Sequence, residues 1–128
     1  MTQTSIPKWQ FVTGWVLSGI LGLLFLPSAF FKIAQPGAFL EGWTKSYPAG
    51  AALPLGIVEV TMFVLYLVPK TRYLGGLVML AYLGGAVATH LRDGDPKLVL
   101  PIAVGVVAWV GLFLRDRKLR ALVPVVDE

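Results

Sequence analysis

The chain contains no cysteine and a single histidine among its 128 residues. Without cysteine, a disulfide framework, a thiol redox relay, thiolate-bound metals and a cysteine nucleophile are all excluded. One histidine excludes haem ligation by two imidazoles and a two-histidine zinc site within one chain. We therefore predict no metal site and no intrinsic cofactor, and any electron transfer would need a bound organic molecule or another subunit.

Charged residues are also scarce. They make up 14% of the chain, whereas hydrophobic residues make up 56%, and the mean hydropathy is +0.75. A soluble domain of this size could not cover so much apolar surface with polar side chains. The net charge of +4 comes from basic residues in the short gaps between apolar runs rather than in one stripe, which argues against nucleic-acid binding. The composition predicts an integral membrane protein whose main partner is the lipid bilayer.

Four apolar runs are long enough to cross a bilayer as helices. The first, residues 11–31, would span about 30 Å as a helix, too long for the core of a signal peptide, so we expect it to be retained. The others cover residues 49–68, 73–91 and 98–114. Residues 33–48 are predicted to form an interfacial loop with one short helix. Because no loop could hold a second domain, we predict that residues 1–128 form one all-α domain, a four-transmembrane-helix bundle with up-down topology.

The basic residues predict the orientation of this bundle. Four spans place both termini on one side, and that side carries seven lysines and arginines against four on the other. The positive-inside rule therefore predicts both termini in the cytoplasm and the basic segment 115–120 on the cytoplasmic surface. We expect the membrane to be a bacterial inner membrane. The seven are Lys8, Lys70, Arg72, Arg115, Arg117, Lys118 and Arg120, and the four are Lys32, Lys45, Arg92 and Lys97.

Small residues recur along the first span. Gly14, Ser18 and Gly22 are spaced by four, so they share one helix face that another helix can approach closely. We favour packing within the chain over a homodimer seam for this face. Pro27 removes one backbone hydrogen bond near the end of the span and predicts a kink there.

Glu59 is the only carboxylate inside a predicted span. A carboxyl group in a bilayer normally faces the bundle interior, a wet cavity or a partner. With alternating span directions, Lys32, His90 and Arg92 fall in the same outer half as Glu59, so we expect at least one of them within its reach. The structural interpretation is a paired acid that fixes helix register. The functional one is a proton donor or acceptor, or an anchor for the hydroxyl or carbonyl of a lipophilic ligand.

We predict a ligand pocket in this outer half, walled by the first three spans. Its candidate catalytic residues are Glu59 and His90. Gly56 lies one turn before Glu59 and Tyr82 shares a helix face with His90, which makes both candidates for contacting a ligand. The candidate cofactor-binding residues are thus Lys32, Gly56, Tyr82 and Arg92. The alternatives are that Lys32 and Arg92 extend toward water at the membrane surface, and that His90 is satisfied by the Asp-Gly-Asp turn that follows it.

Several short segments resemble the DoxX-like family of small four-helix membrane proteins. They are A-F-F-K ending at Lys32, L-G-I-V-E ending at Glu59, V-P-K-T-R-Y-L-G-G ending at Gly76, and T-H-L-R-D-G-D-P starting at Thr89. The resemblance covers nearly the whole chain. Such families are named after the membrane subunit of a thiosulfate to quinone oxidoreductase. Other members look like membrane anchors for oxidative-stress complexes, and distant relatives resemble sterol isomerase-like and receptor-assembly proteins.

The resemblance implies a membrane subunit that binds a quinone or another lipophilic molecule and supports a partner oxidoreductase subunit. A second hypothesis is an enzyme that isomerises a lipophilic substrate or opens an epoxide, with Glu59 as acid or base and His90 as its partner. A third is an assembly or scaffold protein that uses its small-residue faces.

Overall fold

The computed structural model describes residues 5–122, and every regular element in that part of the chain is helical. Four helical stretches are long and apolar enough to cross a membrane: Lys8–Ala34, Ala49–Leu67, Arg72–Arg92 and Pro96–Arg115. This confirms the all-α fold and the four predicted spans. The elements are α1 (Lys8–Ala34), α2 (Gly37–Trp43), η1 (Ala49–Ala51), α3 (Ala52–Leu67), α4 (Arg72–Arg92), η2 (Pro96–Leu98), α5 (Val99–Arg115) and α6 (Arg117–Leu122).

The first span is longer than its uncharged run. The Pro7 carbonyl accepts hydrogen bonds from the N–H groups of Gln10 and Phe11, so the helix already begins at Lys8. Pro27 lies inside α1, which nevertheless continues to Ala34. There Gln35 adopts a left-handed conformation, with φ of 52°, and ends the helix. The predicted interfacial loop contains one short helix, α2, as expected.

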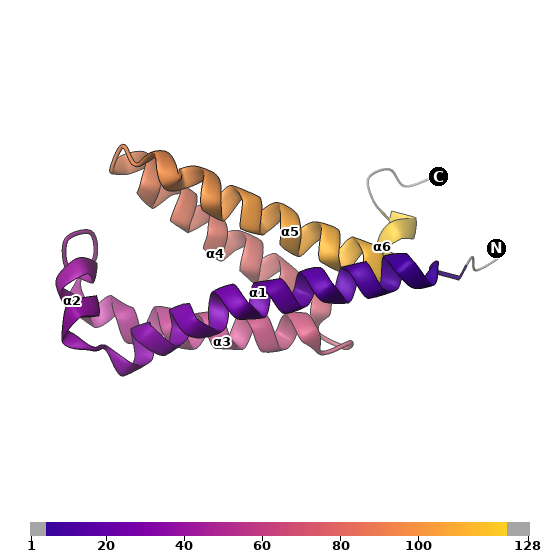
Figure 1. The fold of residues 1–128 in the computed structure, drawn as a ribbon, viewed down its shortest axis with the longest axis horizontal. Helices are drawn as coiled ribbons and strands as arrows, with labels where there is room; N and C mark the ends of the chain where they lie inside the picture. Colours follow the sequence, from indigo (N-terminus) through magenta and orange to yellow (C-terminus); the bar gives the residue numbers. More distant parts are fainter. Residues whose placement is uncertain (1–4, 123–128) are drawn as a thin grey trace.

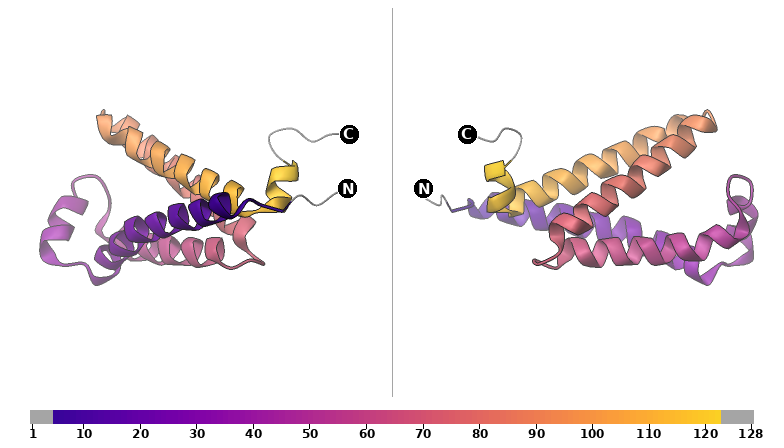
Figure 2. Two further views of the ribbon diagram at one scale, coloured as in Figure 1. Left: turned by 45° about the vertical axis from the view of Figure 1, so that its right-hand side comes forward. Right: turned by 180° about the vertical axis from the view of Figure 1, so that it is seen from behind.

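The four spans form a closed ring of neighbours. α1 packs against α3 and α5, and α4 packs against the same two helices. The first turn of α1, the α3–α4 turn and α6 all lie at one end, which we call the terminal end (Figure 1). The α4–α5 hairpin lies close to α1 and α3 at the terminal end and diverges from them toward the end that carries α2 (Figures 1 and 2). We call that second end the α2 end.

Glycines set how closely the helices approach. A Cβ atom on Gly14 would lie 2.7 Å from the Gly111 carbonyl oxygen of α5, and one on Gly22 would lie 2.8 Å from the Phe63 ring of α3. Ser18, between them, is buried and donates to the Gly14 carbonyl at 2.9 Å. This small-residue face thus packs against α5 at Gly14 and against α3 at Gly22, both within the chain, as predicted. Both contacts lack room for a larger side chain.

The buried core runs along the axis of the bundle. One hydrogen bond crosses it, from the Tyr66 hydroxyl to the Ala108 carbonyl at 2.6 Å. The outward faces are apolar as well, since Leu23 is 76% exposed and Leu77 67%. Such surface suits lipid rather than water. The core residues are Leu21, Phe25, Met62, Phe63, Tyr66, Met79, Leu83, Ala108, Leu112 and Leu119.

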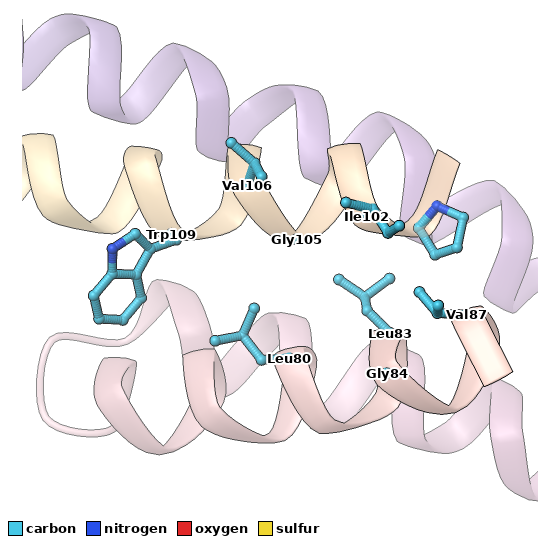
Figure 3. A pocket seen from close by; sticks show the side chains of 9 residues that line it. Leu80, Leu83, Gly84, Val87, Ile102, Gly105, Val106 and Trp109 are labelled. Carbon is cyan, nitrogen blue, oxygen red and sulfur yellow. The ribbon is translucent and has the colours of Figure 1, made fainter. Parts of the chain in front are cut away.

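A shallow apolar groove of about 380 Å³ runs between α4 and α5 (Figure 3). Leu80, Leu83 and Gly84 on α4 face Ile102 and Val106 on α5 across it. The indole N–H of Trp109 is the only polar side-chain group in the lining. The groove therefore offers shape to a lipid chain but no group that would orient a ligand.

The C-terminal basic segment contains two buried charged residues. Arg117 and Lys118 are exposed, but Arg115 is only 6% exposed and Asp116 only 1%. Asp116 accepts from the backbone N–H of Leu119 at 2.8 Å and so caps α6, which folds back against α5. Asp116 also forms an ion pair with Arg72 at the start of α4. The charged C-terminal segment thus contains a buried ion pair, Asp116 with Arg72, that links the end of α5 to the start of α4.

Candidate functional site

Glu59 lies in the interior of the bundle. The α3 helix turns its carboxylate toward α1, and the residue is only 2% exposed. The Nζ atom of Lys32, at the end of α1, lies 2.7 Å from Oε1 of Glu59. The prediction that Glu59 faces inward with a cation in reach is therefore confirmed, with Lys32 as the cation.

Lys32 does not extend toward water. It is 9% exposed, and besides Glu59 it donates to the hydroxyl of Ser28, one turn earlier on α1, at 2.5 Å. Ser28 in turn donates to Oε1 of Glu59 at 3.2 Å. Ser28 is not among the predicted site residues, although its spacing of four from Lys32 places both on one face of α1. Burial is possible for Lys32 because two acceptors replace its water shell.

Tyr82 brings a third helix to the same oxygen. Its hydroxyl donates from α4 to Oε1 of Glu59. Oε1 therefore accepts from Lys32, Ser28 and Tyr82, an arrangement that suits an ionised carboxylate because this group only accepts hydrogen bonds. In contrast, Oε2 of Glu59 is buried and has no hydrogen-bond partner among the described residues.

Glu59 lines a cavity of about 530 Å³ at the α2 end. The cavity lies where α4 diverges from α1 and α3, so it is walled by the first three spans, as predicted, and also by α2 and the loop after it. Its lining mixes aromatic, small and polar groups. The lining residues are Lys32, Trp43, Tyr47, Leu55, Glu59, Ala81, Tyr82, Gly85, Ala86, Thr89 and His90.

A stack of aromatic rings holds α2 over this cavity. Ring centroids are 6.4 Å apart for Phe31 and Phe39, 5.6 Å for Phe39 and Trp43, and 4.3 Å for Trp43 and Tyr47. The Trp43 ring also lies 5.8 Å from Nζ of Lys32, within reach of a cation–π contact. Trp43 and Tyr47, both in the predicted interfacial loop, thus form part of the cavity wall.

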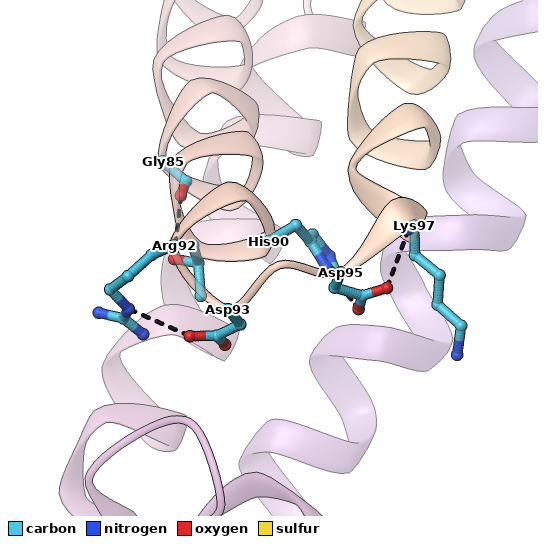
Figure 4. Close-up of polar contacts among 7 residues, drawn as sticks. Gly85, His90, Arg92, Asp93, Asp95 and Lys97 are labelled. Carbon is cyan, nitrogen blue, oxygen red and sulfur yellow. Dashed lines mark hydrogen bonds and ion pairs between the residues drawn. The ribbon is translucent and has the colours of Figure 1, made fainter.

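His90 lines the same cavity but interacts with the turn that follows it. Its Nδ1 atom lies 3.0 Å from Oδ2 of Asp95, while Oδ1 of Asp95 accepts from the backbone N–H of Lys97 (Figure 4). This N–H and the imidazole lower the pKa of Asp95. Arg92 is exposed and donates to Asp93. Neither His90 nor Arg92 contacts Glu59, because the local turn supplies both with carboxylates.

Gly56 serves the site indirectly. A Cβ atom there would lie 2.9 Å from the Ile33 side chain and 3.1 Å from the Ala29 carbonyl oxygen, so Gly56 lies at the contact between α3 and α1. It is not among the residues that line the cavity. Its lack of a side chain permits the close approach that brings Lys32 to Glu59.

The chemistry open to this site is that of hydrogen bonding and proton exchange. Residues 5–122 contain no group of three or more acidic or histidine side chains arranged to hold a metal ion. An ammonium group has three donors, and Lys32 uses two of them on Ser28 and Glu59. Within residues 5–122, Lys32 therefore keeps one unused donor, Glu59 keeps one unused acceptor at Oε2, and both residues line the cavity.

Comparison with known proteins identifies one family. The family model of the DoxX-like family matches residues 16–111, which include the first three spans from Val16 onward, the cavity residues and most of α5. No curated protein and no solved structure shows significant similarity to the chain.

Proposed function

Because the chain belongs to the DoxX-like family and buries a carboxylate beside a cavity, we propose that it binds a lipophilic molecule through a hydroxyl or carbonyl headgroup. The ligand that we propose is a quinone and its reduced quinol. The protein would serve as the quinone-binding membrane subunit of an oxidoreductase system.

One observation carries this proposal: Oε2 of Glu59 is buried without a hydrogen-bond partner among residues 5–122, while Glu59 lines the cavity. Leaving a buried carboxylate oxygen without a hydrogen bond costs about 1–3 kcal/mol or more. A hydroxyl group bound in the cavity would donate to this oxygen and remove that cost. A quinol supplies such a hydroxyl.

The remaining donor of Lys32 suits the oxidised form. A quinone carbonyl is an acceptor, and the third N–H of Lys32 is free to donate to it from the same wall of the cavity. The pair Lys32 and Glu59 would thus hold both forms of one ligand, each through a different group. The bound quinone would supply the redox chemistry, for which the cysteine-free chain offers no thiol of its own.

The walls of the cavity suit a flat ring. Pockets for small molecules have volumes of about 300–1,000 Å³ and are lined mainly by apolar and aromatic groups with a few polar ones. The cavity, at about 530 Å³, is lined by the aromatic residues Trp43, Tyr47 and Tyr82. It is also lined by the small residues Gly85 and Ala86 of α4. An isoprenoid tail would extend from it among the lipid chains.

Two neighbouring glycines on α4 allow a direct test. A Cβ on either Gly85 or Gly84 would meet no atom within 4 Å, so both should accept leucine without loss of the fold. Gly85 lines the cavity, whereas Gly84 lines the apolar groove on the other side of α4. Gly85→Leu should weaken binding of decylubiquinol, measured by saturable tryptophan quenching in detergent, about tenfold or more, because the new side chain takes the ring's place.

The matched variant Gly84→Leu should bind as the parent chain does. The dimethyl ether of the quinol, which cannot donate a hydrogen bond to Oε2, should bind about tenfold more weakly than the quinol. Equal binding by the Gly85 and Gly84 variants, or loss only in the Gly84 variant, would contradict the assignment of the cavity.

The same free oxygen also supports the second hypothesis, an acid–base enzyme. Oε2 of Glu59 could take a proton from a bound substrate. Its expected partner His90 lines the cavity but pairs with Asp95. Mass spectrometry of lipophilic material before and after incubation with the protein separates the two: a binding subunit returns its ligand unchanged, whereas an isomerase or epoxide-opening enzyme changes its structure.

A further inference from the structure

A second cavity, of about 480 Å³, lies at the terminal end, away from the Glu59 site. Four basic side chains and one acidic side chain contribute to its wall, so its formal charge is strongly positive. A neighbouring hollow of about 530 Å³ adds Arg120 and Gln10 to the same region. The second cavity is lined by Ser5, Ile6, Phe11, Arg72, Arg115, Asp116, Arg117 and Lys118.

The one acidic residue in this wall is already fully engaged. Asp116 pairs with Arg72, accepts from the Tyr73 hydroxyl at 2.7 Å and caps α6 through the N–H of Leu119. It therefore balances Arg72 and holds three helices together. Because Asp116 pairs with Arg72, its negative charge does not balance those of Arg115, Arg117 and Lys118 as well.

Arg115 is a buried cation that forms no ion pair with an acidic side chain between residues 5 and 122. It is 6% exposed, donates through Nη2 to the Tyr66 carbonyl at 2.7 Å, and lies over the rings of Trp15 and Tyr66 at 4.4 and 4.8 Å. Its Nε atom has no hydrogen-bond partner in the part of the chain that the structure describes. Within residues 5–122, Arg115, Arg117 and Lys118 form no ion pair with a carboxylate. A buried charge in this situation is costly unless an anion compensates it.

We propose that this cavity binds a phosphate group, with Arg115 at its base and Arg117 and Lys118 at its mouth. Guanidinium groups suit phosphate because their planar N–H donors match its oxygens. Two exposed cations above a buried one would draw the anion in and then cover it. The Nε–H group of Arg115, which has no partner among residues 5–122, would donate a hydrogen bond to the phosphate.

The position of the cavity favours the phosphate of an anionic lipid. Arg72 begins α4 and Arg115 ends α5, so these cations lie at the ends of two spans, at the depth of lipid headgroups. Phe11, one turn into α1, adds an apolar wall on which an acyl chain could lie. Basic pockets between transmembrane helices bind anionic headgroups in this way.

Thermal unfolding in neutral detergent tests the proposal with three probes: phosphatidylglycerol, phosphatidylcholine and inorganic phosphate. Phosphatidylglycerol should raise the unfolding midpoint of the parent chain by about 3 °C or more, and the rise should shrink as salt is added. Phosphatidylcholine, whose phosphate is neutralised by its own cation, should have little effect. A full rise with inorganic phosphate alone would support the same site with a free anion as its ligand.

Variants test whether the rise in the unfolding midpoint depends on the cations of this cavity. Arg117→Gln/Lys118→Gln removes two exposed cations that form no ion pair within residues 5–122, and it should lose at least half of the rise caused by phosphatidylglycerol. The control Lys45→Gln/Lys97→Gln removes the same charge from exposed positions at the α2 end and should keep the full rise. Arg115→Lys, which keeps the charge but loses the planar donors, should also weaken the response.

Two results would overturn the proposal. One is that neither phosphatidylglycerol nor phosphate changes the unfolding midpoint of the parent chain. The other is that the two double variants respond alike, because the effect would then follow net charge rather than this cavity.

Discussion

Glu59 and Lys32 bury opposite charges between α3 and α1, and the value of this pair can be measured. Glu59→Gln keeps an acceptor for Ser28 and Tyr82 but leaves Lys32 buried without a counter-charge. Breaking a buried ion pair in this way should lower the free energy of unfolding by about 3–5 kcal/mol. Unfolding in mixed detergent micelles measures the change.

The companion variants are Lys32→Met and the double variant. Once the carboxylate is neutral, removing Lys32 no longer strands a charge, so the double variant should be more stable than the sum of the single effects by about 1 kcal/mol or more. Additive effects would mean that the two charges do not stabilise each other in the folded chain.

The polar residues of the site could be predicted only in part. The alternating direction of the spans predicts that Glu59 and Lys32 come together, because it places both in the same half of the bundle. The direction of the spans makes His90 and Arg92 equally good candidates for contacting Glu59. It does not show that Asp95 and Asp93, in the turn that follows, contact His90 and Arg92 instead. The aspartates of the turn are the partners because the turn holds them next to His90 and Arg92, whereas Glu59 lies on another helix.

Among the elements, α1 packs closely against both α3 and α5, and two of its glycines make opposite predictions. A Cβ on Gly14 would lie 2.7 Å from a backbone oxygen of α5, whereas one on Gly19 would meet no atom within 4 Å. Gly14→Ala should therefore force α1 and α5 apart and cost about 1–3 kcal/mol of folding stability.

Gly19→Ala is the matched control on the same helix. It should be neutral or stabilising by up to about 1 kcal/mol, because alanine favours helix over glycine. Thermal unfolding of both variants in one detergent provides the comparison. If both lowered the midpoint equally, the contact between α1 and α5 would not be the cause.

At this scale the sequence predicts the spans well and their ends less well. A helix needs about 20 apolar residues to cross a bilayer, and that requirement is visible in the chain. The ends depend on side-chain partners instead. α1 begins at Lys8 and ends at Ala34, since interfacial residues can remain helical and Lys32 turns inward. Asp116 ends α5, caps α6 through the N–H of Leu119, and also pairs with Arg72, 44 positions away, a partner that no local pattern reveals.

The whole molecule has a polar cluster toward each end and an apolar middle. Toward the α2 end, Glu59 and Lys32 balance each other beside a cavity where the helices diverge. At the terminal end, where the helices converge, Asp116 balances Arg72 and leaves Arg115, Arg117 and Lys118 in excess. The bundle is therefore electrically asymmetric along its axis, and this asymmetry is what the positive-inside rule acts on.

This asymmetry predicts a cytoplasmic terminal end, and the absence of cysteine from the chain makes the prediction simple to test. Lys97 and Lys118 are exposed at opposite ends, so Lys97→Cys and Lys118→Cys should both fold. Gly94 is a poorer site, because its φ of 66° strains any other residue. In intact spheroplasts, a membrane-impermeant maleimide should label the Lys97 variant at once and the Lys118 variant only after permeabilisation. The reverse pattern would mean that the excess cations face outward, and the bundle would then be inserted against the positive-inside rule.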